Sequence, residues 1–201
     1  MKTFVAKALF NSHTYLEYRK LIIDLLREGK STAVDQTEEL THYSELNEAR
    51  MRRLDKTMKI SEENSAKLKT LNKSYIWLVL TESWCGDAAQ ILPIFNKMAM
   101  ESVDKIEMKL VLRDENEELM NHFLTNNGKA IPKLLIIDKA TGSVVNDWGP
   151  RPQAAINLIE KYKKKFGVID ETLKTELQMW YLHDKGVSTK NEIMQLLQDL
   201  E

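Results

Sequence analysis

Three short runs of apolar, β-branched and aromatic residues constrain the fold of this chain more than any other feature of its sequence. They span Tyr75–Leu80, Met108–Leu112 and Lys133–Ile137, and each has the composition of a buried strand. Helical patterns at Ala88–Met100 and Glu115–Leu124 separate the three runs. Strands that alternate with helices usually pair in parallel, so the first two runs predict a parallel pair within an α/β fold.

Two further elements complete the predicted central unit. Thr141 and Gly142 form a turn signal before Ser143–Asp147, which predicts a last strand in a hairpin. Gln153–Phe166 then has its apolar residues on one side, as a helix on a sheet does. We therefore expect a mixed sheet flanked by helices over residues 74–166.

The segments on either side of this unit are expected to be helical extensions that pack on it. Residues 1–73 form the first extension, and a stripe of apolar residues spaced three and four apart predicts a helix that Gly29 ends. Residues 167–201 form the second extension. There Thr189 and Glu192 have the spacing of a capping box and predict a helix that starts at Thr189.

Composition narrows the classes of function. Hydrophobic residues make up 43% of the 201 and charged residues 29%, which is typical of a folded protein. The formal net charge of -1 argues against nucleic acid as a partner. We find neither a secretory signal nor a run of about 20 apolar residues, so no membrane partner is expected. A single cysteine cannot form an internal disulfide, and a cytoplasmic location follows as the expectation.

A four-residue motif, WCGD at Trp84 to Asp87, lies between the first predicted strand and the next helix. Pro93 falls inside that helix, and Ile131 and Pro132 precede a later strand. In this order the features resemble the thioredoxin superfamily, with its WCGPC motif, its helix-kinking proline and its cis-proline dipeptide. The strings ESWCGDAAQ, IPK and WGPRP are similar to a bacterial subgroup of that family with helices on both sides. The resemblance covers about residues 74–166 and implies a thioredoxin-like fold.

The resemblance also implies that Cys85 is the attacking thiol. A thiolate is the reactive form of cysteine, and the first turn of a helix stabilises it through N–H groups that lack partners in the helix. The alternative is a cysteine that packs as a small hydrophobic side chain. Ala88 takes the place of the family's second cysteine, which would resolve a mixed disulfide. An external thiol would therefore have to resolve any mixed disulfide that Cys85 forms.

Further site residues are expected around the thiol. Asp87 is either a proton acceptor for the thiol or an N-terminal capping residue of the helix. Trp84 and Gly86, with Ile131 and Pro132, are the expected residues of a groove that binds a peptide or a thiol ligand. The alternative is that Pro132 forms a turn without any ligand.

The resemblance further implies where a buried acid and lysine would manage protons. Their places in this sequence are Val79 and Leu110, and both residues are apolar. This pair of substitutions suggests that the proton-handling groups have been lost. The four histidines are scattered, without the spacing of metal ligands, so neither a metal nor another cofactor is expected.

Three functions remain open on these observations. The favoured one is thiol–disulfide exchange by a monothiol oxidoreductase, with protein or low-molecular-weight thiols and disulfides as partners. The second is a non-catalytic binding module that keeps the fold and uses the groove around Pro132. The third is peroxide sensing, with Cys85 oxidised to a sulfenic acid and then joined to Cys85 of another copy.

Overall fold

The structure is a computed structural model that describes residues 2–201. These residues fold into two compact units, one made of residues 2–150 with Glu201 and the other of residues 151–200. Each unit has its own set of secondary-structure elements, and the two are described in turn.

A four-stranded mixed sheet forms the centre of the first unit, in the order β2-β1-β3-β4. Its strands are β1 (Tyr75–Thr81), β2 (Ile106–Leu112), β3 (Lys133–Asp138) and β4 (Val144–Trp148). β1 pairs in parallel with β2, while β3 runs antiparallel to both β1 and β4. The expected α/β class and the parallel first pair are confirmed.

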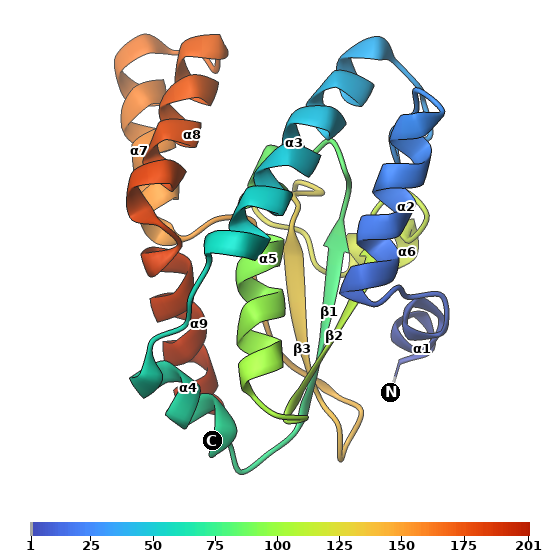
Figure 1. The fold of residues 1–201 in the computed structure, drawn as a ribbon, viewed down its shortest axis with the longest axis vertical. Coiled ribbons are helices and arrows are strands. Elements are labelled where there is room, and N and C mark those ends of the chain that lie inside the picture. Colours follow the sequence, from blue (N-terminus) through green and yellow to red (C-terminus); the bar gives the residue numbers. More distant parts are fainter. Residues whose placement is uncertain (1) are drawn as a thin grey trace. The chain divides into compact units, whose positions relative to one another are not determined.

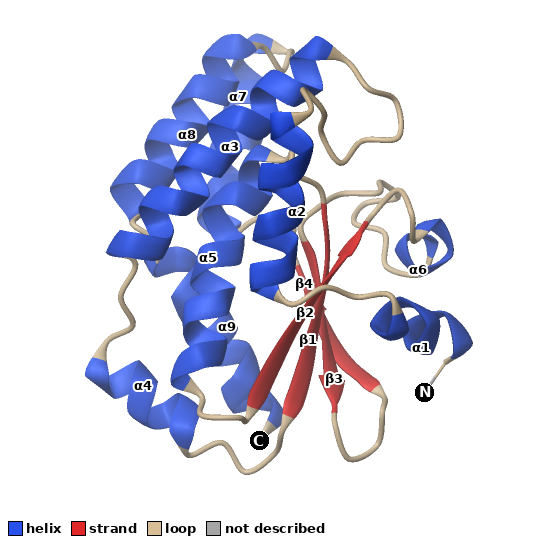
Figure 2. Ribbon diagram, turned by 45° about the vertical axis from the view of Figure 1, so that its right-hand side comes forward, coloured by secondary structure: helices blue, strands red, loops and turns tan. Residues whose placement is uncertain are grey.

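Helices cover both faces of this sheet (Figures 1 and 2). One face carries α5 (Gly86–Glu101), with α3 (Glu38–Thr57) packed outside it, and the other carries α1 (Thr3–Phe10) and α6 (Glu117–Asn121). Between the sheet and α5, Trp77 meets Phe95 edge-to-face at a centroid distance of 5.6 Å. This contact holds α5 on the sheet, and the WCGD motif lies where β1 ends and α5 begins.

The helices that precede the sheet begin at side-chain caps. α2 (Tyr15–Arg27) starts with a capping box in which Thr14 and Glu17 bond each other's backbone N–H groups. α4 (Glu62–Lys69) starts at Ser61, whose hydroxyl accepts from the N–H of Asn64. Gly29 follows the end of α2 with a φ of +68°, a conformation that glycine adopts without strain. The helical character expected for this segment is confirmed.

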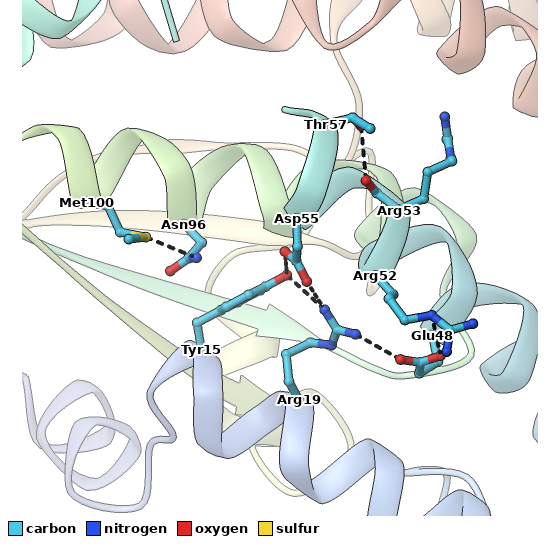
Figure 3. Close-up of polar contacts among 9 residues, drawn as sticks. All are labelled: Tyr15, Arg19, Glu48, Arg52, Arg53, Asp55, Thr57, Asn96 and Met100. Carbon is cyan, nitrogen blue, oxygen red and sulfur yellow. Dashed lines mark hydrogen bonds and ion pairs between the residues drawn. The ribbon is translucent and has the colours of Figure 1, made fainter. Parts of the chain in front are cut away.

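A cluster of charged side chains joins α2 to α3 (Figure 3). Arg19 of α2 bonds Glu48 at 3.0 Å and also pairs with Asp55, both of which belong to α3. The hydroxyl of Tyr15 donates to Asp55 at 2.7 Å. Burial, followed by its hydrogen bond to Asp55, raises the pKa of Tyr15 well above its usual value. One arginine thus links two carboxylates on the neighbouring helix.

The second unit consists of α7 (Gln153–Phe166), α8 (Glu171–Asp184) and α9 (Val187–Leu200). The expected start of the last helix was wrong, since α9 begins at Val187 and Thr189 lies 1% exposed inside it. The carboxylate of Glu192 accepts from the backbone N–H of Gln153 at 2.7 Å, which satisfies the first turn of α7. Glu192 therefore bonds the start of α7, and Thr189 is buried inside α9, so the two residues form no capping box.

Candidate functional site

The sulfur of Cys85 lies at the start of α5, beside the loop that precedes β3. Cys85 is the N-cap residue of α5, and the N–H of Ala88 points to its Sγ at 3.5 Å. On the other side Sγ donates to the carbonyl oxygen of Ile131 at 3.3 Å. Cys85 as a whole residue is 8% exposed. An N–H group of a helix start favours a thiolate, while the low exposure limits which reagents can reach it.

The loop before β3 brings Ile131 and Pro132 to the thiol. The bond between them is cis, and Ile131 is 6% exposed. Gly149 follows β4 and lies against this loop, where a Cβ at its position would come within 2.2 Å of the carbonyl oxygen of Pro132. Only glycine leaves room for the Pro132 backbone there. Gly149 also has a φ of +121°, which side chains other than that of glycine rarely allow. The structure thus brings together Cys85 and Ile131, which lie 46 residues apart.

The ring of Trp84 packs against the guanidinium group of an arginine. The guanidinium of Arg113 lies 4.8 Å from the ring centroid, and its Nε donates to Asp114 at 2.7 Å. The Nε1 of Trp84 is buried and has no hydrogen-bond partner among residues 2–201. Arg113 follows β2 and was not among the residues expected from the sequence, because nothing in a lone arginine at a strand end points to a distant tryptophan.

Gly86 and Asp87 form the first turn of α5. Gly86 is half-buried, and Asp87 is 6% exposed and is the acidic residue of that turn. A carboxylate at this place complements the positive end of the helix dipole. Pro93 lies inside the same helix, as expected from the sequence.

Buried polar side chains hold residues 82–85, which connect β1 to α5 and which we call the thiol loop. Their members are Thr32, Ser44, Asn47 and Ser83, and we call them the Ser83 network. Asn47 of α3 donates to the carbonyl oxygen of Ser83 at 2.8 Å. The N–H of Thr32 donates to the hydroxyl of Ser83 at 3.1 Å, and the hydroxyls of Ser83 and Ser44 lie 2.7 Å apart. The N–H of Ser83 in turn donates to the Thr32 hydroxyl at 2.9 Å. Ser83, two positions before Cys85, is thus held by α3 and by the segment that precedes α3.

Glu82 adds a titratable group to this region. Its side chain is buried, with the residue 1% exposed, and it accepts from the hydroxyl of Thr32 and, at 3.0 Å, from the N–H of Asp114. Burial raises the pKa of Glu82 to about 7, against the opposing effect of these two hydrogen bonds. The charge of Asp114 raises this pKa further, and Arg113 lowers it. Sequence reasoning assigned no role to Glu82 or Ser83, because polar residues at a strand end are ordinary in loops.

Val79 and Leu110 lie side by side in the sheet. They are register partners in β1 and β2, and both are fully buried. The two positions that the resemblance reserved for an acid and a lysine are therefore neighbours filled by apolar side chains. A buried carboxyl occurs instead three residues later, at Glu82.

Among residues 2–201, histidine, cysteine and acidic side chains form no group of three or more that could hold a metal ion. No helix within the same residues has both the length and the apolar character that a bilayer span requires.

Comparison with known proteins places the chain in a family. A family model described as thioredoxin matches residues 33–163. No curated protein matches. Among solved structures, a protein of unknown function from Pseudomonas aeruginosa is similar with a TM-score of 0.61 and 15% identity, over 94% of this chain and 99% of that one. An HIV epitope scaffold is similar with a TM-score of 0.57 and 16% identity, over 93% and 99%. These identities support the fold alone, whereas the family model spans more than half of the sequence, so this chain belongs to the thioredoxin family.

Proposed function

We propose that Cys85 performs thiol–disulfide exchange as a single thiol. The Cys85 thiolate attacks one sulfur of a disulfide, forms a mixed disulfide and releases the other half as a thiolate. A second, external thiolate then attacks the mixed disulfide, which returns the Cys85 thiolate and a new disulfide. Atoms and electrons balance without a cofactor, and the partners are protein or low-molecular-weight thiols.

One observation carries this proposal, namely the position of Sγ between the N–H of Ala88 and the carbonyl oxygen of Ile131. The first group favours the thiolate, and the second belongs to the loop that would run along a bound substrate. Since position 88 is an alanine, the mixed disulfide has no resolving thiol within the chain.

The test is incubation of the protein with glutathione disulfide, followed by intact-mass analysis. We expect one glutathione adduct per chain, its removal by excess reduced glutathione, and no adduct on Cys85→Ser. An unmodified wild-type protein after prolonged incubation near neutral pH would overturn the exchange reaction.

A non-catalytic binding module is the second candidate. The 8% exposure of Cys85 favours it, because a cysteine this buried can act as a packing residue without taking part in any reaction. On this reading Cys85→Ser binds its partner as the wild type does. Peroxide sensing needs Cys85 of two copies to meet, and a non-reducing gel after peroxide treatment tests it by the appearance of a doubled mass.

A further inference from the structure

Glu82 is a buried carboxyl that joins three parts of the chain near the thiol. One carboxylate oxygen accepts from Thr32, in the segment between α2 and α3, and the other accepts from the N–H of Asp114, after β2. The backbone of Glu82 belongs to the thiol loop, since its carbonyl oxygen accepts from the N–H of Cys85 at 3.2 Å. Glu82 has no role in the exchange reaction proposed above.

The hydrogen bonds around Thr32 can accommodate both protonation states of Glu82. When Glu82 is ionised, the Thr32 hydroxyl donates to its Oε2. The other oxygen already accepts from the N–H of Asp114, so an added proton belongs on Oε2. The Thr32 oxygen can then accept from that proton while its own hydrogen turns to the Ser83 hydroxyl, 3.2 Å away. Neither state leaves a buried hydroxyl unpaired.

Charged and titratable groups face Glu82 from several elements. Arg113 and Asp114 follow β2, with opposite effects on the pKa of Glu82. Tyr18 of α2 has its pKa raised by burial first and then by the charges of Glu82 and Cys85, so both groups act on one hydroxyl. Beyond Asn47, the guanidinium of Arg50 donates to the Asn47 amide oxygen at 2.7 Å. Among these surroundings the pKa of Glu82 itself is raised to about 7, with burial as the largest cause.

We propose that Glu82 is a positioning residue for Cys85: its side chain holds the loop before Cys85 through Thr32 and Asp114, and its ionisation sets the reactivity of the thiol. An ionised Glu82 places a negative charge beside the thiol loop and opposes formation of the thiolate. A protonated Glu82 removes that charge, and the turn of the Thr32 hydroxyl keeps the loop in place. This inference rests on the proposed thiol chemistry and adds a pH response to it.

The experiment is the alkylation rate of Cys85 by iodoacetamide from pH 5 to 10, with Cys85→Ser as the blank. In Glu82→Gln we expect the midpoint of the rate profile to fall by about half a pH unit, with alkylation about two- to threefold faster at pH 7.5, because the opposing charge is gone. The matched control is Glu118→Gln, which removes an exposed carboxyl from α6 and should leave the profile unchanged.

A second pair of variants keeps the test decisive if Glu82→Gln folds poorly. Thr32→Val removes the hydroxyl that donates to the carboxylate, whereas Thr32→Ser keeps it. We expect carbon-13 NMR of the Glu82 carboxyl to show its titration at higher pH in Thr32→Val, and at the wild-type pH in Thr32→Ser. Direct titration of Glu82 tests this inference without any reaction at Cys85. The proposed exchange reaction is tested separately, and it is contradicted if glutathione disulfide leaves Cys85 unmodified.

Three results would count against the inference, and the first two would overturn it outright. The first is a Glu82→Gln profile that superimposes on the wild-type profile, and the second is a Glu82 carboxyl that titrates near pH 4.5 in the folded protein. A faster reaction at every pH by one constant factor would also count against it, because that result reports a looser loop without any part for the Glu82 charge.

Discussion

The charged cluster between α2 and α3 and the Ser83 network both fasten α3, but they are built from opposite kinds of side chain. In the cluster, Arg19, Glu48 and Asp55 have side chains 11%, 16% and 33% exposed, so water reaches the carboxylates. In the network, Ser44 and Asn47 are fully buried and Ser83 is 3% exposed. The charges of the cluster stay partly hydrated, whereas the fully buried hydroxyl and amide groups of the network are neutral.

The two regions also differ in what they hold. The cluster joins one helix to another, whereas the network joins α3 to the loop that carries Cys85. Loss of the cluster should therefore reduce stability and leave the chemistry of the folded thiol unchanged. Loss of the network should change both.

The largest effect expected is for Arg19→Met. Removal of the guanidinium leaves Glu48 and Asp55 close together without their cation, and we expect the free energy of unfolding to fall by about 3 kcal/mol. Arg19→Lys keeps a charge but not the planar group that reaches both carboxylates, so its loss should be smaller. Urea denaturation measures both. An alkylation rate of Cys85 that changes more than twofold in the folded Arg19→Met protein would show that the cluster also controls the thiol.

A pH-dependent effect of similar size is expected at Glu82. Its pKa is raised from 4.5 to about 7 in the folded protein, so the stability it contributes is complete below pH 4.5 and is lost as the pH rises through 7. The free energy of unfolding of the wild type, relative to Glu82→Gln, should fall by at most about 3 kcal/mol over this range. Denaturation of both proteins at several pH values measures the difference, and a constant difference would contradict the raised pKa.

Asn47→Ala should have a smaller effect on stability but a direct effect on the thiol. It leaves the buried carbonyl oxygen of Ser83 without its donor, at a cost of about 2 kcal/mol. Because the loop is then held less firmly, we expect Cys85, now 8% exposed, to be alkylated several-fold faster. Asn157→Ala, an exposed change in α7, is the control. An unchanged alkylation rate in Asn47→Ala would mean that the loop keeps its position without the network.

The same contrast explains what the sequence could predict. The strands and most helices follow from local patterns. The approach of Ile131 to the thiol was implied by the resemblance of the ordered motifs to the thioredoxin superfamily, because no local pattern links two residues 46 positions apart. The Ser83 network could not be predicted, because Thr32 and Ser44 lie 51 and 39 residues from Ser83 and no local pattern links them. The start of α9 was missed for a related reason, since Glu192 bonds Gln153, 39 residues away, in place of its own helix start.

The smallest effect expected is for Ser44→Ala, and it tests whether the network acts as a unit. The Ser44 hydroxyl donates to the carbonyl oxygen of Leu40 at 2.9 Å, so the hydroxyl of Ser83 donates to Ser44 and accepts from the N–H of Thr32. Without Ser44, the Ser83 hydroxyl can turn to the Thr32 oxygen, 3.2 Å away, which limits the loss to about 1 kcal/mol.

A double-mutant cycle then compares the two regions directly. Ser44→Ala and Asn47→Ala both act on Ser83, so their effects on unfolding should not add, with a coupling of about 0.5 kcal/mol or more. Ser44→Ala and Arg19→Met act on separate contacts of α3 and should add within about 0.5 kcal/mol. Strong coupling in the second pair would join the charged cluster and the Ser83 network into one structure, and the expected separation between stability and thiol reactivity would be lost.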